Sequence, residues 1–237
     1  MNNDLQNTLY KLAQSGLSDN PAYSALLQDY TKYHAVLFIE GSIFMLLFVM
    51  LSIYFWRKFM KLPKSNFRKW SFEKKAYFGF GLGSIVMFLF MLLIVMANLS
   101  NVLNPQDGFK QTIPDIAVPQ AGTQKALIYH AVNLWAKSGN DQMPSILQNE
   151  IKKRLSWQIP KAIICSVLLV VFFAFTNYIW QRLISFSQTS NPIWARKEKV
   201  LIATGIVNIS ITLLLMLMAL ANTQASFAPI TLTLLFS

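Results

Sequence analysis

The sequence predicts an all-α membrane protein with four transmembrane helices, arranged as two parallel-repeat helical hairpins with amphipathic helices outside the cytoplasm. Composition is the first reason: 54% of the 237 residues are hydrophobic and 13% are charged, against about 25% charged residues in an ordinary soluble domain. The second reason is a set of four long apolar runs, and the third is the recurrence of residues between the two halves of the chain. Lipid solvates such a composition better than water does, which argues against a soluble or disordered protein.

Four runs are long enough to cross a membrane, because a hydrocarbon core of about 30 Å requires about 20 helical residues. In lipid such runs must be helical, since a helix satisfies its backbone hydrogen bonds within one segment. The first run follows a polar stretch and lacks the preceding basic region of a cleavable signal peptide. The predicted spans are residues 35–56, 76–99, 162–180 and 200–221.

Basic residues are concentrated in the short loops 57–75 and 181–199, which hold twelve of the 21 lysines and arginines. The positive-inside rule places both loops in the cytoplasm, where their charges set the orientation and meet anionic lipid headgroups rather than nucleic acid. Both termini are then extracytoplasmic. Lysine usage, a disulfide-free exterior and the lack of a targeting segment favour a bacterial cytoplasmic (inner) membrane. The predicted headgroup and orientation residues are Arg57, Lys58, Lys61, Arg68, Lys69, Lys74, Lys75, Arg196, Lys197 and Lys199.

The predicted organisation alternates between the two sides of the membrane. An extracytoplasmic helical segment (1–34) precedes the first transmembrane hairpin (35–99), and an extracytoplasmic linker with a helical segment (100–160) follows it. The second hairpin (161–221) leads into an apolar extracytoplasmic tail (222–237). This tail is too short to span, so we expect it to lie in the membrane interface or to dock on another protein.

An internal duplication is indicated by an offset of 124 positions between the halves, which is 123 upstream of the spans, where it takes Ser15 to Ser138 and Pro21 to Pro144. Each repeat holds two spans, so both repeats have the same orientation and their pseudo-two-fold axis runs along the membrane normal. Four such helices pack into a filled bundle without a central aqueous channel. The offset takes Trp56 to Trp180, Trp70 to Trp194, Gly81 to Gly205, Asn98 to Asn222 and Pro105 to Pro229.

Each repeat also begins with a predicted amphipathic outer helix. Gly16 and Gly139 fit the left-handed residue that ends a helix, and Pro21 and Pro144 fit the first turn of the next one. Such helices lie on a membrane surface or cap the bundle. The predicted apolar faces consist of Leu5, Leu9, Leu12 and Ala13 in the first repeat, and of Leu127, Ala131, Leu134 and Trp135 in the second.

Glu40 is the one acidic residue within a predicted span, and its counterpart in the second repeat is Ile164. A carboxylate in hydrocarbon is costly, so it is either protonated or paired. The candidate partners are His34, Lys161, and Cys165 or Ser166. Glu40 is therefore a candidate proton or cation site or a subunit contact, with a structural hydrogen bond between helices as the alternative.

Ser84 and Asn208 are repeat mates, and both lie about eight residues inside the cytoplasmic end of a span, where polar side chains hydrogen-bond across helices. We interpret them as interhelical contacts, with a polar conduction path as the alternative. Four glycines predict close helix packing, and two of them have GxxxG spacing. They are Gly79, Gly81, Gly83 and Gly205.

Enzyme signatures do not occur in the sequence. His34, His130 and Cys165 are the only histidines and the only cysteine, so they cannot assemble a structural zinc site, and we expect neither a metal nor a cofactor. No GxSxG, HExxH or P-loop pattern is present.

Two functional hypotheses remain. The first is a non-catalytic integral subunit of a larger membrane assembly, such as a secretion, transport or defence complex. The second is a homo-oligomeric channel or transporter for ions or small solutes, which would use Glu40 and the polar layer of Ser84 and Asn208. In either case the expected partners are membrane lipids together with further copies or other membrane subunits.

Overall fold

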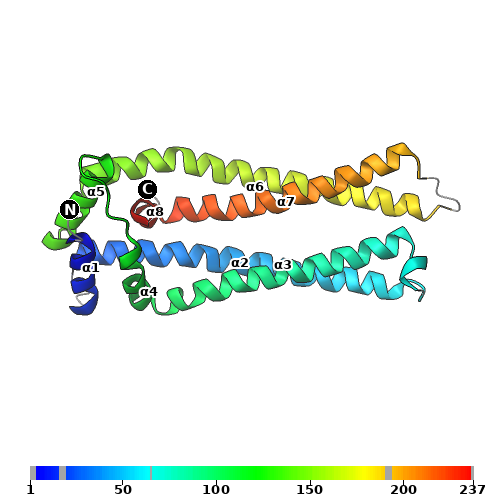
Figure 1. The fold of residues 1–237 in the computed structure, drawn as a ribbon, viewed down its shortest axis with the longest axis horizontal. Coiled ribbons are helices and arrows are strands. Elements are labelled where there is room, and N and C mark those ends of the chain that lie inside the picture. Colours follow the sequence, from blue (N-terminus) through cyan, green and yellow to red (C-terminus); the bar gives the residue numbers. More distant parts are fainter. Residues whose placement is uncertain (1–3, 16–19, 65, 190–193, 236–237) are drawn as a thin grey trace. The chain divides into compact units, whose positions relative to one another are not determined.

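The structure is a computed structural model, which describes residues 4–15, 20–64, 66–189 and 194–235. Every secondary-structure element in this part of the chain is helical, and Figure 1 labels the α-helices. The elements are α1 (Asp4–Ser15), α2 (Pro21–Lys61), η1 (Phe67–Lys69), α3 (Phe72–Leu103), α4 (Pro105–Thr112), η2 (Ile113–Asp115), α5 (Gln124–Ser138), α6 (Ser145–Ser187), α7 (Arg196–Phe227) and α8 (Pro229–Leu235).

The four predicted spans are confirmed as helices that are long and apolar enough to cross a membrane: α2, α3, α6 and α7. Helices α2 and α6 have 41 and 43 residues, about twice the length that a bilayer core requires. Each therefore runs without a break from an outer segment into its predicted span. Pro160 lies inside α6, where it removes one backbone donor without ending the helix.

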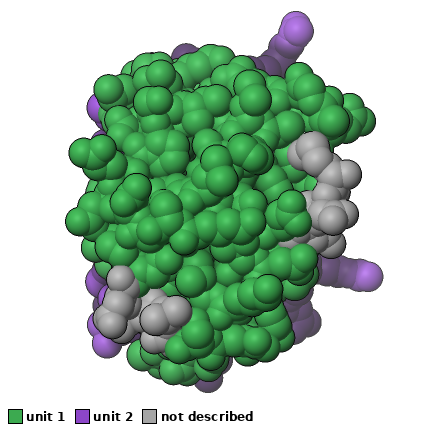
Figure 2. Space-filling model, turned by 90° about the vertical axis from the view of Figure 1, so that its left-hand side faces the viewer, with its two compact units in different colours: residues 1–39, 95–162, 221–237 green, residues 40–94, 163–220 purple. Residues whose placement is uncertain are grey.

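The chain forms two compact units, coloured green and purple in Figure 2. Unit 1 comprises residues 1–39, 95–162 and 221–237, and unit 2 comprises residues 40–94 and 163–220. Most of each predicted span belongs to unit 2. Unit 1 contains α1, α4, α5 and α8 together with the first parts of α2 and α6 and the last parts of α3 and α7.

Unit 1 has a hydrophobic core that sequence periodicity partly anticipates. Leu5 and Leu9 of α1 are fully buried, as the amphipathic pattern predicts. They pack with Leu26 and Tyr30 of α2 and with Val132 of α5 in one cluster. Since each large apolar side chain contributes about 2 kcal/mol when it leaves water, this cluster gives the outer helices a core of their own.

The predicted apolar face of α5 is divided in the structure. Trp135 is buried, whereas Leu127 and Leu134 are 60% and 53% exposed. The core instead receives Ile128 and Val132, which lie on the same side of the helix as Trp135. Because α5 is apolar on two sides, its sequence pattern did not determine which side would pack inward.

The ends of the outer helices follow the expected chemistry. Thr123 caps the start of α5 by accepting a hydrogen bond from the Ala126 amide, and Gly139 ends the helix with a φ of 65°. Pro21 is the first residue of α2, and Pro144 directly precedes α6. Gly16, the predicted counterpart of Gly139, lies outside the described residues.

The apolar tail forms α8 and packs in the core of unit 1 of its own chain. Ile230, Thr231 and Thr233 are buried. The Asp29 carboxylate accepts hydrogen bonds from the Thr231 amide (2.6 Å) and the Thr231 hydroxyl (2.7 Å). The structure thus gives the tail an intramolecular docking site, where the sequence suggested another protein or the membrane interface.

Candidate functional sites

His34 lies in a polar site of unit 1 that joins α2 to α3. Its Nδ1 is 2.7 Å from Asn98 Oδ1 and 3.4 Å from Asn101 Nδ2, so two amides of α3 lie within hydrogen-bond distance of the imidazole. The imidazole also packs edge-on against Tyr30 and Tyr33. Helix α3 continues beyond Asn98 to Leu103, so Asn98 lies inside this helix and ties it to α2.

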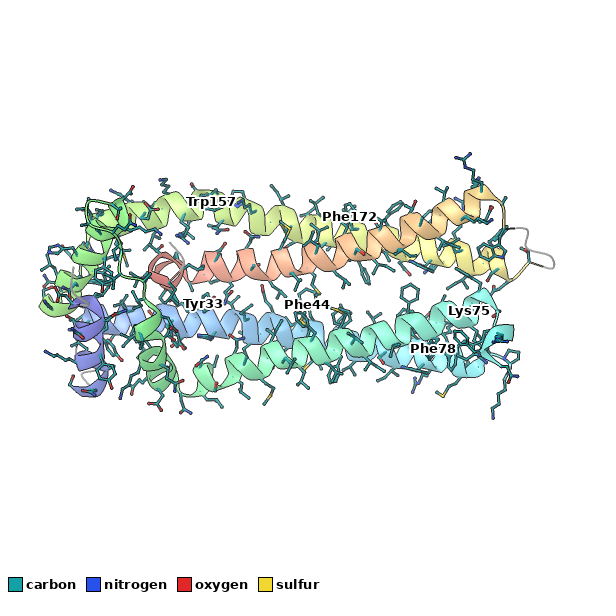
Figure 3. The ribbon with its side chains drawn as sticks, viewed as in Figure 1. Tyr33, Phe44, Lys75, Phe78, Trp157 and Phe172 are labelled. Atoms are coloured by element: carbon teal, nitrogen blue, oxygen red, sulfur yellow. The ribbon has the colours of Figure 1, made fainter. Side chains whose placement is uncertain are left out.

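Lys161 and Glu40 occupy different units. The Lys161 ammonium lies 3.8 Å from the centroid of the Trp157 ring in unit 1, and Figure 3 labels that tryptophan on α6. Glu40 is half-buried in α2 at the start of unit 2. The partners that the structure assigns to His34 and Lys161 are therefore Asn98 and Trp157.

The polar layer inside unit 2 is centred on Asn208 of α7. Its amide donates to the Phe172 carbonyl of α6 at 2.9 Å and to the Thr176 hydroxyl. Phe172 is labelled in Figure 3. Thr212 completes the layer by donating to the Asn208 carbonyl at 2.7 Å. These hydrogen bonds join α6 to α7. Ser84, the predicted mate of Asn208, is buried on α3.

The glycines of the spans fall into two groups. A Cβ atom on Gly81 would lie 3.1 Å from Trp56 Nε1, and one on Gly205 would lie 3.1 Å from Trp180 Nε1. At these two positions glycine allows an indole ring to rest on the neighbouring helix backbone. A Cβ on Gly79 or Gly83 would meet no atom within 4 Å.

The predicted headgroup residues lie at the ends of the long helices, and most are exposed. Arg57, Lys58 and Lys61 end α2, Arg68 lies in η1, Lys75 begins α3, and Arg196, Lys197 and Lys199 begin α7. The side chain of Lys69 lies outside the described part of the structure.

Lys74 differs from these exposed cations, because it is 6% exposed. Its ammonium lies 5.2 Å from the Phe59 ring centroid and 5.3 Å from the Trp70 ring centroid, and it donates to the Pro63 carbonyl. Phe78 packs against Phe59 and Trp70 in the same aromatic cluster; Figure 3 labels it, together with Lys75. The loop after α2 is therefore held by a buried lysine that the charge pattern alone did not distinguish from its neighbours.

Unit 1 contains a small cavity and a larger open groove among the described residues. None of them forms a group of three or more metal-ligating side chains. A cavity between Tyr30, Phe109 and Thr231 measures about 10 Å³, about the least space that can hold one water molecule. A more open groove of about 390 Å³ is lined by Asp4, Thr8, Lys11 and Lys137.

The helices define a class of protein, a helical multi-pass membrane protein. No family model, curated protein or solved structure matches this chain. Its function must therefore be argued from its own residues.

Proposed function

We propose that this duplicated protein is a non-catalytic integral subunit of a larger membrane assembly, of the secretion, transport or defence kind. We place it in a bacterial cytoplasmic membrane with both termini outside. Four helices of membrane-spanning length support the membrane location. The exposed basic residues at the end of α2 and at the starts of α3 and α7 support the orientation.

Helix boundaries support the duplication. Helices α3 and α7 both have 32 residues, and the offset of 124 takes both ends of α3 onto those of α7. The same offset takes Pro105, the first residue of α4, to Pro229, the first residue of α8. Ser15 and Ser138 end α1 and α5 at an offset of 123. Unrelated halves would have no reason to begin and end their helices at matching positions.

Contacts between helices support the same conclusion and favour a pair of hairpins. Trp56 of α2 covers Gly81 of α3, and at the same offset Trp180 of α6 covers Gly205 of α7. Two matched residues thus make the same contact in each repeat. We infer that α2 pairs with α3 and α6 with α7, as expected for a repeated helical hairpin.

A second pair of equivalent contacts lies in unit 1. A Cβ on Gly108 of α4 would lie 2.8 Å from the Tyr30 hydroxyl of α2. At the offset of 124 these positions become Leu232 and Arg154, where the arginine donates to the Leu232 carbonyl at 3.4 Å. The chemistry has diverged, but in both repeats the short helix after the second span meets the same position of the long helix.

The observation that carries the subunit proposal is the outer face of α5. Leu127 and Leu134 are more than half exposed, although this helix belongs to a unit with a hydrophobic core of its own. They lie two helical turns apart with the half-buried Ala131 between them, which forms a stripe typical of helix packing. An exposed apolar stripe marks a contact surface more often than scattered single residues do.

Affinity purification of an N-terminally tagged chain, expressed at native level and crosslinked in its membrane, tests the proposal. We expect other membrane proteins to co-purify in a fixed ratio with the wild-type chain. Leu127→Glu combined with Leu134→Glu should reduce partner recovery about tenfold, since two buried charges oppose helix packing. The control Gln120→Glu combined with Gln142→Glu adds the same charge at exposed loop positions and should retain the partners.

The channel hypothesis makes the opposite prediction. If the purified assembly contains only multiples of the 27.0 kDa chain, and Glu40→Gln abolishes ion flux into liposomes without changing the assembly, the subunit proposal is wrong. Deletion of residues 224–237 is unsuitable for this test, because α8 is part of the core of unit 1.

A further inference from the structure

Lys74, in the first turn of α3, shows how this fold buries an ammonium group. Lys74 Nζ lies against the Phe59 and Trp70 rings and donates to a backbone carbonyl. Aromatic faces attract a cation through their quadrupole, and more strongly where water is excluded. In the first repeat the ammonium group beside the aromatic rings is supplied by a side chain of the protein, Lys74.

A second aromatic cluster of unit 2 surrounds Trp194 of the second repeat and includes Phe72, the first residue of α3 in the first repeat. The Trp194 ring lies 4.8 Å from Phe72 and 5.4 Å from Phe186, measured between centroids. Phe72 also stacks on Trp180, with an interplanar angle of 8°. Trp194 is the repeat mate of Trp70, so an indole occupies the same position in both clusters.

The position of Lys74 is taken in the second repeat by Glu198, which reverses the charge. Glu198 lies in the first turn of α7, and its Oε2 atom is buried without a hydrogen-bond partner anywhere in the described residues. The neighbouring cations Arg196 and Lys197 do not supply one. A buried carboxylate oxygen is costly unless a cation or another donor reaches it.

We propose that Glu198 and Trp194 bind the ammonium group of an ethanolamine phospholipid at the cytoplasmic end of the second hairpin. This inference rests on the proposed duplication. Trp194 and Glu198 are four residues apart at the start of α7, as Trp70 and Lys74 are at the start of α3, where the two side chains touch. The external ammonium takes the place that Lys74 Nζ fills in the first repeat.

The charges around the site favour a zwitterionic headgroup. Arg196, Lys197 and Lys199 are exposed on either side of Glu198, and such cations bind phosphate. A single carboxylate among three cations therefore matches a headgroup that carries an ammonium close to a phosphodiester. An anionic lipid such as phosphatidylglycerol would satisfy the cations and leave Glu198 without a partner.

Native mass spectrometry of the delipidated full chain in detergent tests the site, with phosphatidylethanolamine and phosphatidylglycerol as probes. We expect the wild type to retain one phosphatidylethanolamine preferentially. Glu198→Gln should weaken that binding about tenfold and leave phosphatidylglycerol binding unchanged, because only the ammonium contact is lost. Glu73→Gln, the matched control in the first turn of α3, should retain the preference.

A second variant keeps the test decisive if Glu198→Gln does not fold. Glu198→Lys supplies an internal ammonium as Lys74 does, so the protein should fold and lose its preference for phosphatidylethanolamine. A folded Glu198→Lys protein that keeps the preference, or an equal loss in Glu73→Gln, would overturn the site. Displacement of the lipid by millimolar free ethanolamine would assign the site to a soluble amine instead. Partner recovery, which tests the subunit proposal, is a separate measurement.

Discussion

At the scale of single residues, the two glycines beneath tryptophans are the most constrained positions of the spans. Trp56 rests on Gly81 and is itself held edge-on by Phe59 and Phe78. Trp180 rests on Gly205 and is held by Phe80. Because neighbouring rings surround each indole, neither can move aside easily to admit an added methyl group.

We therefore predict that Gly81→Ala and Gly205→Ala each lower the free energy of unfolding by about 1–3 kcal/mol, the usual cost of overpacking. Gly79→Ala and Gly83→Ala should not destabilise the protein, since their added Cβ atoms meet no neighbour within 4 Å. Unfolding by increasing SDS in mixed micelles measures all four variants. Equal effects at the four positions would refute the contact-based explanation.

At the scale of elements, α8 is a helix too short to be stable alone, so its contacts with the rest of unit 1 must stabilise it. It has seven residues, fewer than an isolated helix needs in water. The Asp29 carboxylate fixes its first turn through the amide and hydroxyl of Thr231. Helix α4, which starts at the matching proline, has an exposed aspartate, Asp107, at the position that corresponds to Thr231.

Asp29→Ala should release α8, because removing one partner of a buried hydrogen-bond pair costs about 1–3 kcal/mol. We expect amide hydrogen exchange over residues 229–235 to become at least about tenfold faster. Asp107→Ala provides the matched control and should leave exchange in both short helices unchanged. Unaltered protection of α8 in Asp29→Ala would show that apolar packing alone holds the tail.

At the scale of the whole molecule, topology follows from the charges at the helix ends. Basic side chains end α2 and begin α3 and α7, and crossing the hydrocarbon would cost each of them several kcal/mol. In the proposed topology, two spans in each half of the chain return it to the side from which it entered. The proposed orientation, with the loops 57–75 and 181–199 in the cytoplasm, is open to direct chemical test.

Cysteine labelling supplies that test in a Cys165→Ala background, which removes the one native thiol. Lys64→Cys should react with a membrane-impermeant maleimide only after permeabilisation. Gln142→Cys, in the loop before α6, should react in intact cells. Both positions are exposed, so the side of the membrane decides their reactivity. Labelling of residue 64 from outside would reverse the topology.

The sequence predicted parts of the candidate sites better than others, for identifiable reasons. Apolar runs and helix-ending residues are local signals, so the four spans and the end of α5 at Gly139 could be derived from them. The pairing of His34 with Asn98 could not, because their separation of 64 residues leaves no periodic trace. The recurrence of asparagine at positions 98 and 222 was the sequence signal that could have pointed to it.

The existence of four apolar helices could be derived from the sequence, because an apolar run of this length satisfies its backbone hydrogen bonds in lipid only as a helix. The helices begin and end beyond the predicted spans, since α2 starts at Pro21 and α6 at Ser145. The offset of 124 positions, on which the proposed duplication rests, is also a property of the sequence. Tertiary packing determines which side of α5 faces the core, that Lys74 lies among aromatic rings, and that α8 docks on Asp29. Those outcomes depend on which surfaces meet, and residues distant in sequence compete for the same neighbours.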